Sequence, residues 1–110
     1  MSLTLAEYQQ KATETAIYPE IGKYPIGPMY AVIGLCGEAG EVADQVKKSW
    51  RNEQLMSKAR KANIEDEAGD VLWYLAQLAT ELDLSLEEIA VANLNKLASR
   101  LKKKEIQNHP

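Results

Sequence analysis

The chain has 110 residues, of which 45% are hydrophobic and 26% charged, and its formal net charge is −3 at pH 7. This size and composition predict an ordinary globular protein, and the mild acidity argues against nucleic acid as the main partner, because binding to a phosphate backbone needs a dense positive field. No apolar run reaches membrane-spanning length and the N-terminus lacks a signal-peptide pattern, so we expect no membrane contact and a cytoplasmic location.

The first half of the chain predicts two helices separated by a loop. Residues 5–16 form the first helix, which follows a capping box made by Thr4 and Glu7. Residues 18–28 contain three prolines and two glycines, a composition that interrupts a helix and predicts an ordered loop or a mobile cover. The second helix is predicted over residues 28–50, because proline is well suited to the first position of a helix.

The second half of the chain predicts two further helices. Residues 51–61 have no strong period, and the sequence leaves open whether they form a loop or a short extra helix. Asn63 is a good cap for a third helix over residues 64–82. A second capping box, SLEE, begins the fourth helix, which is predicted over residues 86–104.

These elements predict an all-α fold, since no stretch alternates as a strand does. No internal repeat or linker divides the chain, so residues 1–110 are expected to form a single domain. We expect a four-helix-bundle-like protomer with antiparallel helices. A core of this size leaves much apolar surface uncovered, so we also expect a homo-oligomer.

Cysteine and histidine are too scarce for several kinds of active site. The one cysteine, Cys36, has apolar neighbours and is expected to be a small buried side chain. The one histidine, His109, lies beside the C-terminal proline and has no partner for Cys–His or Ser–His–Asp chemistry. Ferritin-like iron sites are disfavoured as well, because their Glu-x-x-His motif is absent.

Two carboxylate pairs, each spaced by three residues, lie beside the apolar stripes of the second and third helices. The first pair is Glu38 and Glu41, and the second is Glu67 and Asp70. Antiparallel packing would bring the pairs together, and crowded carboxylates require either protonation or a cation. Mg²⁺ suits such oxygen ligands best, and Mn²⁺ is an alternative. A solvated face would explain one such pair, whereas two on consecutive helices favour a metal site.

Three glycines surround the first acidic pair, although each glycine inside a helix costs roughly 0.8–1 kcal/mol relative to alanine. Gly34, Gly37 and Gly40 would allow a ligand to approach the backbone closely. The alternative is close contact between helices, which we consider above all for Gly40.

The segment GEAGEVADQVKK, followed by EDEAGDVLWYLAQLATELDLSLEEIAVANLNKL, resembles the MazG-like, all-α nucleotide pyrophosphohydrolases. The resemblance covers about residues 30–101 and implies Mg²⁺-dependent cleavage of a nucleoside triphosphate to the monophosphate and pyrophosphate. It further implies a role in nucleotide-pool house-cleaning and a dimer or dimer of dimers whose helices complete each other's pockets. The residues that match the family's ExxE and ExxD metal ligands are Glu38, Glu41, Glu67 and Asp70.

The chain departs from the family at Gly37, where a further Glu often precedes the first ligand. This difference bears on ligand orientation or on the number of metal ions. In-line attack of an activated water on the α-phosphorus is expected, with Glu38 or Glu41 orienting the water, and the sequence does not choose between them.

Candidate substrate contacts come from three helices. One stripe of the fourth helix carries Asn93, Lys96 and Arg100. The resemblance points to Asn93 and Lys96 as phosphate or sugar contacts. For Arg100, a position on a solvated face is nearly as good an explanation as a phosphate contact. Lys48 is a phosphate candidate, although an ion pair with Asp44 is simpler.

The aromatic residues offer a platform for the base. Tyr74 follows Asp70 by one turn and is the better candidate for stacking. Trp50 is expected either to line the base pocket or to cap the core, and Trp73 to fill a subunit interface. The tyrosines that border the Pro/Gly loop suit either closure over substrate or packing. They are Tyr18, Tyr24 and Tyr30.

Two alternatives remain open. One is a specialised relative that hydrolyses dUTP or phosphoribosyl-ATP. The other is a non-catalytic helical module that dimerises and binds a partner through its apolar surface.

Overall fold

The computed structural model describes residues 2–53 and 56–108. Within these residues the fold is all-α, as predicted, with no β-strand. Its elements are α1 (Leu5–Ala12), a 3₁₀ turn (Thr13–Thr15), α2 (Ile26–Lys48), a π-helical turn (Ser49–Glu53), α3 (Lys58–Glu81) and α4 (Leu86–Asn108). The predicted histidine position, His109, lies outside the described residues.

Serine and threonine caps begin three of the helices. The predicted capping box at α1 is confirmed, with Thr4 accepting from the backbone N–H of Glu7 and the Glu7 side chain accepting in return. At α4, Ser85 accepts from the backbone N–H of Glu88. The predicted start of α3 was wrong, because Ser57 caps this helix and Asn63 lies inside it. The first turns of α3 are mostly exposed, so they carry no apolar period that would have revealed them.

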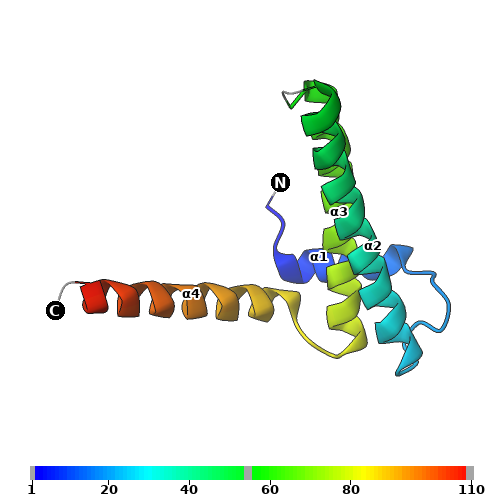
Figure 1. The fold of residues 1–110 in the computed structure, drawn as a ribbon. Helices are drawn as coiled ribbons and strands as arrows, with labels where there is room; N and C mark the ends of the chain where they lie inside the picture. The colour runs from blue at the N-terminus through cyan, green and yellow to red at the C-terminus, as the bar shows by residue number, and fades with distance from the viewer. Residues whose placement is uncertain (1, 54–55, 109–110) are drawn as a thin grey trace.

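The helices α2 and α3 lie side by side, and the chain reverses direction between them (Figure 1). The short α1 packs across α3, and α4 leaves the other helices at the elbow after α3 (Figure 1). The small core at this elbow consists of Ala12, Ala76 and Leu86, with Leu5, Tyr8, Trp73 and Leu75 packed around it. Trp73 was expected at a subunit interface, but it packs inside the chain and its indole N–H donates to Thr15 at 2.9 Å.

The fourth helix does not close a bundle with the other three within the described chain. Every side chain over residues 91–105 of α4 is exposed. The total accessible surface is 8329 Å², whereas a compact protein of 12.3 kDa exposes about 6,100 Å². The radius of gyration is 17.6 Å, against about 13 Å for a compact domain of this length. Much apolar surface therefore remains uncovered in the single chain.

The Pro/Gly loop is attached to the C-terminal end of α3. The Glu81 carboxylate accepts from the hydroxyl of Tyr18 at 3.0 Å and from the backbone N–H of Gly22 at 2.6 Å. Gly22 has a positive φ of 74°, a conformation that favours glycine. Tyr18 is buried and stacks on Tyr30, with ring centroids 5.0 Å apart. This arrangement agrees with the packing alternative for Tyr18 and Tyr30.

One side chain differs in burial from the sequence expectation, and one tyrosine of the loop is strongly exposed. Cys36 is exposed, because it lies on the face of α2 that no other part of the described chain covers. Tyr24 is 81% exposed and lines an apolar hollow with Met29, Ile33 and Leu82. Among the described residues, no helix is both long and apolar enough to cross a bilayer.

Candidate functional site

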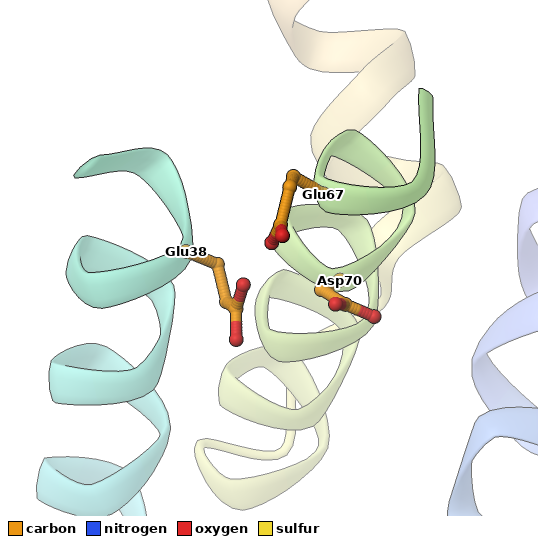
Figure 2. Close-up of side chains that lie close together, drawn as sticks. All are labelled: Glu38, Glu67 and Asp70. Carbon is orange, nitrogen blue, oxygen red and sulfur yellow. The ribbon is translucent and has the colours of Figure 1, made fainter. Parts of the chain in front are cut away.

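Three acidic side chains converge between α2 and α3. Glu38 projects from α2 toward α3, and its carboxyl group faces that of Glu67, while Asp70 lies one turn further along α3 (Figure 2). Each residue offers an oxygen, and these oxygens all lie within 4.8 Å of one another. Glu38 and Glu67 are half-buried, whereas Asp70 is exposed. We call these three residues the acidic cluster.

Crowding changes the ionisation of Glu38. Its pKa is raised from 4.5 to about 7, first because it hydrogen-bonds to Glu67 in the protonated form and then because of partial burial. The negative charges of Asp70, Glu67 and Glu41 act in the same direction. Glu38 is therefore protonated in about half of the molecules at pH 7 when no cation is present. Protonation is one of the two ways to relieve such repulsion.

The pKa of Asp70 is raised as well. Partial burial is the largest cause, followed by the charges of Asp66 and Glu67. Asp66 was not among the predicted site residues, although its position within the acidic run EDE was visible in the sequence. It contributes charge to the site without belonging to the acidic cluster.

Glu41, the fourth predicted ligand, is exposed and is not part of the acidic cluster. It lies three residues beyond Glu38 on α2, which places it about 60° further around the helix. It is nevertheless near enough for its charge to raise the pKa of Glu38. The structure thus brings three of the four predicted ligands together and leaves Glu41 at the edge.

Tyr74 lies beside the acidic cluster and packs against α2. A Cβ atom at Gly34 would overlap its ring, so glycine is required there for the close approach of the two helices. Burial raises the pKa of Tyr74, with additional effects from Tyr30, Glu38 and Asp70. Its ring meets Trp73 edge to face, with centroids 5.0 Å apart. Tyr74 is the aromatic side chain that the site holds most firmly.

The other two glycines have a different environment. A Cβ atom at Gly37 or Gly40 would meet nothing within 4 Å in the described chain. The suggestion that Gly40 serves a close helix contact is therefore wrong for the single chain, where Gly34 has that role. The space around Gly37, next to Glu38, agrees with the alternative of an open approach to the backbone.

A residue that sequence reasoning missed approaches the acidic cluster from α1. The pKa of Tyr8 is raised, mainly by burial and secondarily by the charge of Asp70. The spacing of Leu5, Tyr8 and Ala12 places Tyr8 on the buried face of α1, so its burial was readable, but its position beside Asp70 depends on how α1 packs.

Apart from Tyr74, the predicted phosphate and base contacts lie away from the acidic cluster. Lys48 forms an ion pair with Asp44 at 2.9 Å, which is the simpler of the two interpretations given for Lys48. The hydrogen bond from Lys48 is the main reason why the pKa of Asp44 is lowered. Trp50 is 81% exposed in the π-helical turn, so it does not cap the core. Asn93, Lys96 and Arg100 are exposed on α4, which points away from the acidic cluster (Figure 1). Within one chain, α4 cannot supply phosphate contacts to this cluster.

The donor set fits a hard divalent cation. All three side chains offer carboxyl oxygens, the ligands that Mg²⁺ and Mn²⁺ prefer, and the acidic cluster contains neither sulfur nor nitrogen donors. The raised pKa of Glu38 shows that the carboxyl groups lack a compensating positive charge. A cation there would replace the proton and remove the repulsion.

Comparisons with known proteins identify relatives of this chain. The MazG nucleotide pyrophosphohydrolase domain family matches residues 30–104, which include both acidic pairs. The Gene 37 protein of Mycobacterium phage L5 is 45% identical over 96 residues, which are 84% of this chain and 84% of that protein. The uncharacterized protein YpjD of Bacillus subtilis (strain 168) is 28% identical over 99 residues, 87% of this chain and 89% of that protein. No solved structure matches the chain significantly.

The family match covers well over half of the chain and contains the helices that build the acidic cluster. The chain therefore belongs to the MazG nucleotide pyrophosphohydrolase family.

Proposed function

We propose that this protein is a Mg²⁺-dependent nucleoside triphosphate pyrophosphohydrolase that releases the nucleoside monophosphate and pyrophosphate. The observation that carries the proposal is the convergence of Glu38, Glu67 and Asp70 between α2 and α3, in a chain of this family. Mn²⁺ is the second candidate ion because it accepts the same oxygen ligands. Removal of unwanted nucleotides is the cellular role that fits this reaction.

The carboxyl groups have separate tasks in this proposal. A divalent cation neutralises phosphate charge and lowers the pKa of a coordinated water. Glu38, Glu67 and Asp70 would hold the cation through their oxygens, and Glu41, exposed on α2, would be a further ligand. Glu38 or Glu41 accepts the proton of the water that attacks the α-phosphorus in line with the leaving pyrophosphate.

Tyr74 is the proposed platform for the nucleobase. It is fixed by Gly34 and Trp73 and lies one turn beyond Asp70, so its ring borders the acidic cluster. Stacking of a base on such a ring contributes roughly 1–3 kcal/mol. Trp50 is exposed at the other end of α2 and stays a second candidate for contact with the base.

A homo-oligomer belongs to the same proposal. The apolar side chains of α4, among them Leu94, Leu97 and Leu101, lie exposed along one helix, and the chain exposes roughly 2,000 Å² more than a compact monomer would. A stable interface buries about 1,600 Å² in total, so a second copy has enough surface to cover. In a dimer or dimer of dimers, Asn93, Lys96 and Arg100 would reach the acidic cluster of a neighbouring subunit. Residues 1–110 would then act as one domain of each subunit, in the cytoplasm.

The reaction is tested with a panel of ribo- and deoxyribonucleoside triphosphates and Mg²⁺, in water enriched in ¹⁸O. We expect monophosphate and pyrophosphate as products, with the heavy oxygen in the monophosphate. Diphosphate with orthophosphate would contradict the proposed bond, and label in the pyrophosphate would contradict attack on the α-phosphorus. Including dUTP and phosphoribosyl-ATP in the panel decides whether the protein is a specialised relative.

Variants connect the activity to the acidic cluster. Glu38→Ala and Asp70→Ala are expected to lower turnover at least about a hundredfold, the scale of losing one electrostatic contact in an active site. Glu65→Ala is the matched control, because Glu65 is an exposed carboxylate on α3 outside the acidic cluster. Unchanged turnover in both cluster variants would show that the acidic cluster is not the catalytic site, whereas a wild-type protein without turnover would favour the non-catalytic helical module.

A further inference from the structure

A second cavity lies on the other side of the aromatic residues that border the acidic cluster. It has a volume of about 190 Å³, is partly open to solvent, and is lined by the 3₁₀ turn, the Pro/Gly loop and the C-terminal half of α3. None of its lining residues belongs to the acidic cluster. Gln77, in its wall, lies seven residues after Asp70, which is about 10 Å further along α3.

Gln77 is the unusual residue of this cavity. Its side chain is 1% exposed, and its Nε2 atom is the buried side-chain donor among the described residues that has no hydrogen-bond partner. A buried amide without a partner carries the full cost of its desolvation, so such groups are rare in folded proteins. Gln77 lines the cavity, and because the last torsion of glutamine is broad, rotation about it can turn the NH₂ group toward the cavity. Gln77 therefore offers a donor that the protein itself does not use.

Glu81 provides an acceptor next to this donor. It follows Gln77 by four residues on α3, so the two side chains are neighbours on one face of the helix. Its carboxylate already accepts from Tyr18 and Gly22, but two carboxylate oxygens have room for about four hydrogen bonds. The cavity wall therefore presents a donor and an acceptor side by side.

The charge and size of the cavity limit what it can hold. Its lining includes the carboxylate of Glu81 and no lysine, arginine or histidine, so a phosphorylated ligand would be repelled. The volume of 190 Å³ corresponds to about six liquid water molecules, which is room for one small ring and too little for a nucleotide. The hydroxyl groups of Thr13 and Thr80 add polar atoms to the wall.

We propose that this cavity binds a small neutral lactam, a ring in which a carbonyl and an N–H stand side by side. The carbonyl oxygen accepts from the NH₂ group of Gln77, and the ring N–H donates to the carboxylate of Glu81. This site is separate from the proposed nucleotide site and does not depend on the activity proposed for it.

Uracil is the probe, because it is a small neutral lactam. Wild-type protein is labelled uniformly with ¹³C and ¹⁵N and titrated with uracil in the absence of metal and nucleotide. We expect a saturable shift of the Gln77 amide signal and none at Gln10, an exposed glutamine of α1 outside the cavity. A titration that leaves the Gln77 signal in place, or moves Gln10 equally, would overturn the proposal.

Two related ligands test the recognition. The compound 1,3-dimethyluracil keeps both carbonyls but lacks N–H groups, and it should bind at least tenfold more weakly than uracil. Uridine monophosphate adds a phosphate and should also bind more weakly, as followed by the Gly22 backbone amide. Equal binding of dimethyluracil would refute the role of Glu81, and tighter binding of the monophosphate would make the cavity part of a nucleotide site.

The variant Gln77→Met removes the donor at similar volume, with Gln10→Met as its control. Uracil should bind the variant at least tenfold more weakly, and the unliganded variant should unfold at a higher temperature than wild type because the unpaired amide is gone. A lower unfolding temperature with unchanged uracil affinity would show that Gln77 is already satisfied. If the variant does not fold, the wild-type titration alone tests the proposal. The side-chain amide signal of Gln77 is then assigned through its correlations with the Gln77 backbone.

Discussion

The carboxyl group of Glu38 hydrogen-bonds to that of Glu67 across the gap between α2 and α3, and this contact raises the pKa of Glu38 to about 7. The two residues are 29 positions apart in sequence, yet their oxygens lie within 4.8 Å of each other. Such a pair is stable as a neutral acid beside a carboxylate, or as two carboxylates that share a cation. If the proposed cation binds, the cluster is expected to couple pH, metal binding and stability.

The first prediction concerns pH without metal. Glu38 releases its proton near pH 4.5 in the unfolded chain and near pH 7 in the folded chain, so the folded state binds more protons between these values. Its contribution to the free energy of unfolding is therefore largest at low pH and is lost as the pH rises through about 7. Urea unfolding in EDTA at pH 5 and pH 8 measures this loss, and Glu38→Gln should reduce it. A loss of equal size in the variant would show that Glu38 is not its source.

The second prediction concerns the metal. Millimolar Mg²⁺ should raise the unfolding temperature at pH 8, since an ion that binds only the folded state adds about 2.7 kcal/mol at a hundredfold excess over its Kd. Glu38→Gln and Asp70→Asn should lose this effect, while Glu65→Gln should keep it. Calorimetry with MgCl₂ and with NaCl of equal ionic strength separates binding from screening. The same stabilisation by both salts would contradict a metal site.

The third prediction uses two glycines of α2. Gly34→Ala should lower the free energy of unfolding by roughly 1–3 kcal/mol, because the added methyl group overlaps the Tyr74 ring and forces the helices to shift. Gly37→Ala meets open space and should raise it by roughly 0.4–1 kcal/mol. Urea unfolding of both variants provides the comparison. Destabilisation by Gly37→Ala would indicate that another subunit packs there.

The fourth prediction concerns the uncovered face of α4. Leu94→Lys is expected to shift the protein from an oligomer toward the monomer, because a charge replaces an apolar side chain at the proposed subunit contact. Ser99→Lys, on the opposite face of α4, is the control and should leave the oligomer intact. Size-exclusion chromatography with light scattering measures the mass of each. A monomeric wild type would refute the assembly.

The sequence predicted the local features of the fold well. The capping residues Thr4 and Ser85 fix the starts of α1 and α4, because a cap depends on residues within one turn. The spacing of Glu38, Glu67 and Asp70 beside apolar stripes placed them on facing edges of two helices. Their close approach in the structure follows from that spacing and from the packing of consecutive helices.

What the sequence did not predict depends on contacts between distant elements. The direction of α4 is set by the turn after α3, so no pattern within Leu86–Asn108 reveals it. The surroundings of Trp73 and Cys36 were predicted wrongly. The spacing of residues along a helix shows which side chains share a face, but it does not show which other element covers that face. Gln77 escaped attention because a lone polar residue beside an apolar stripe has no signature until its neighbours are known.

The partial burial of Trp73 and the exposure of Trp50 give the protein two fluorescent reporters in different surroundings. Trp73 touches Thr15 and the Tyr18 ring, so its emission should follow the docking of the N-terminal segment. Trp50 faces water at the end of α2, and its emission should change when a molecule binds there. Replacing either indole with phenylalanine would allow the two events to be timed separately in a stopped-flow instrument.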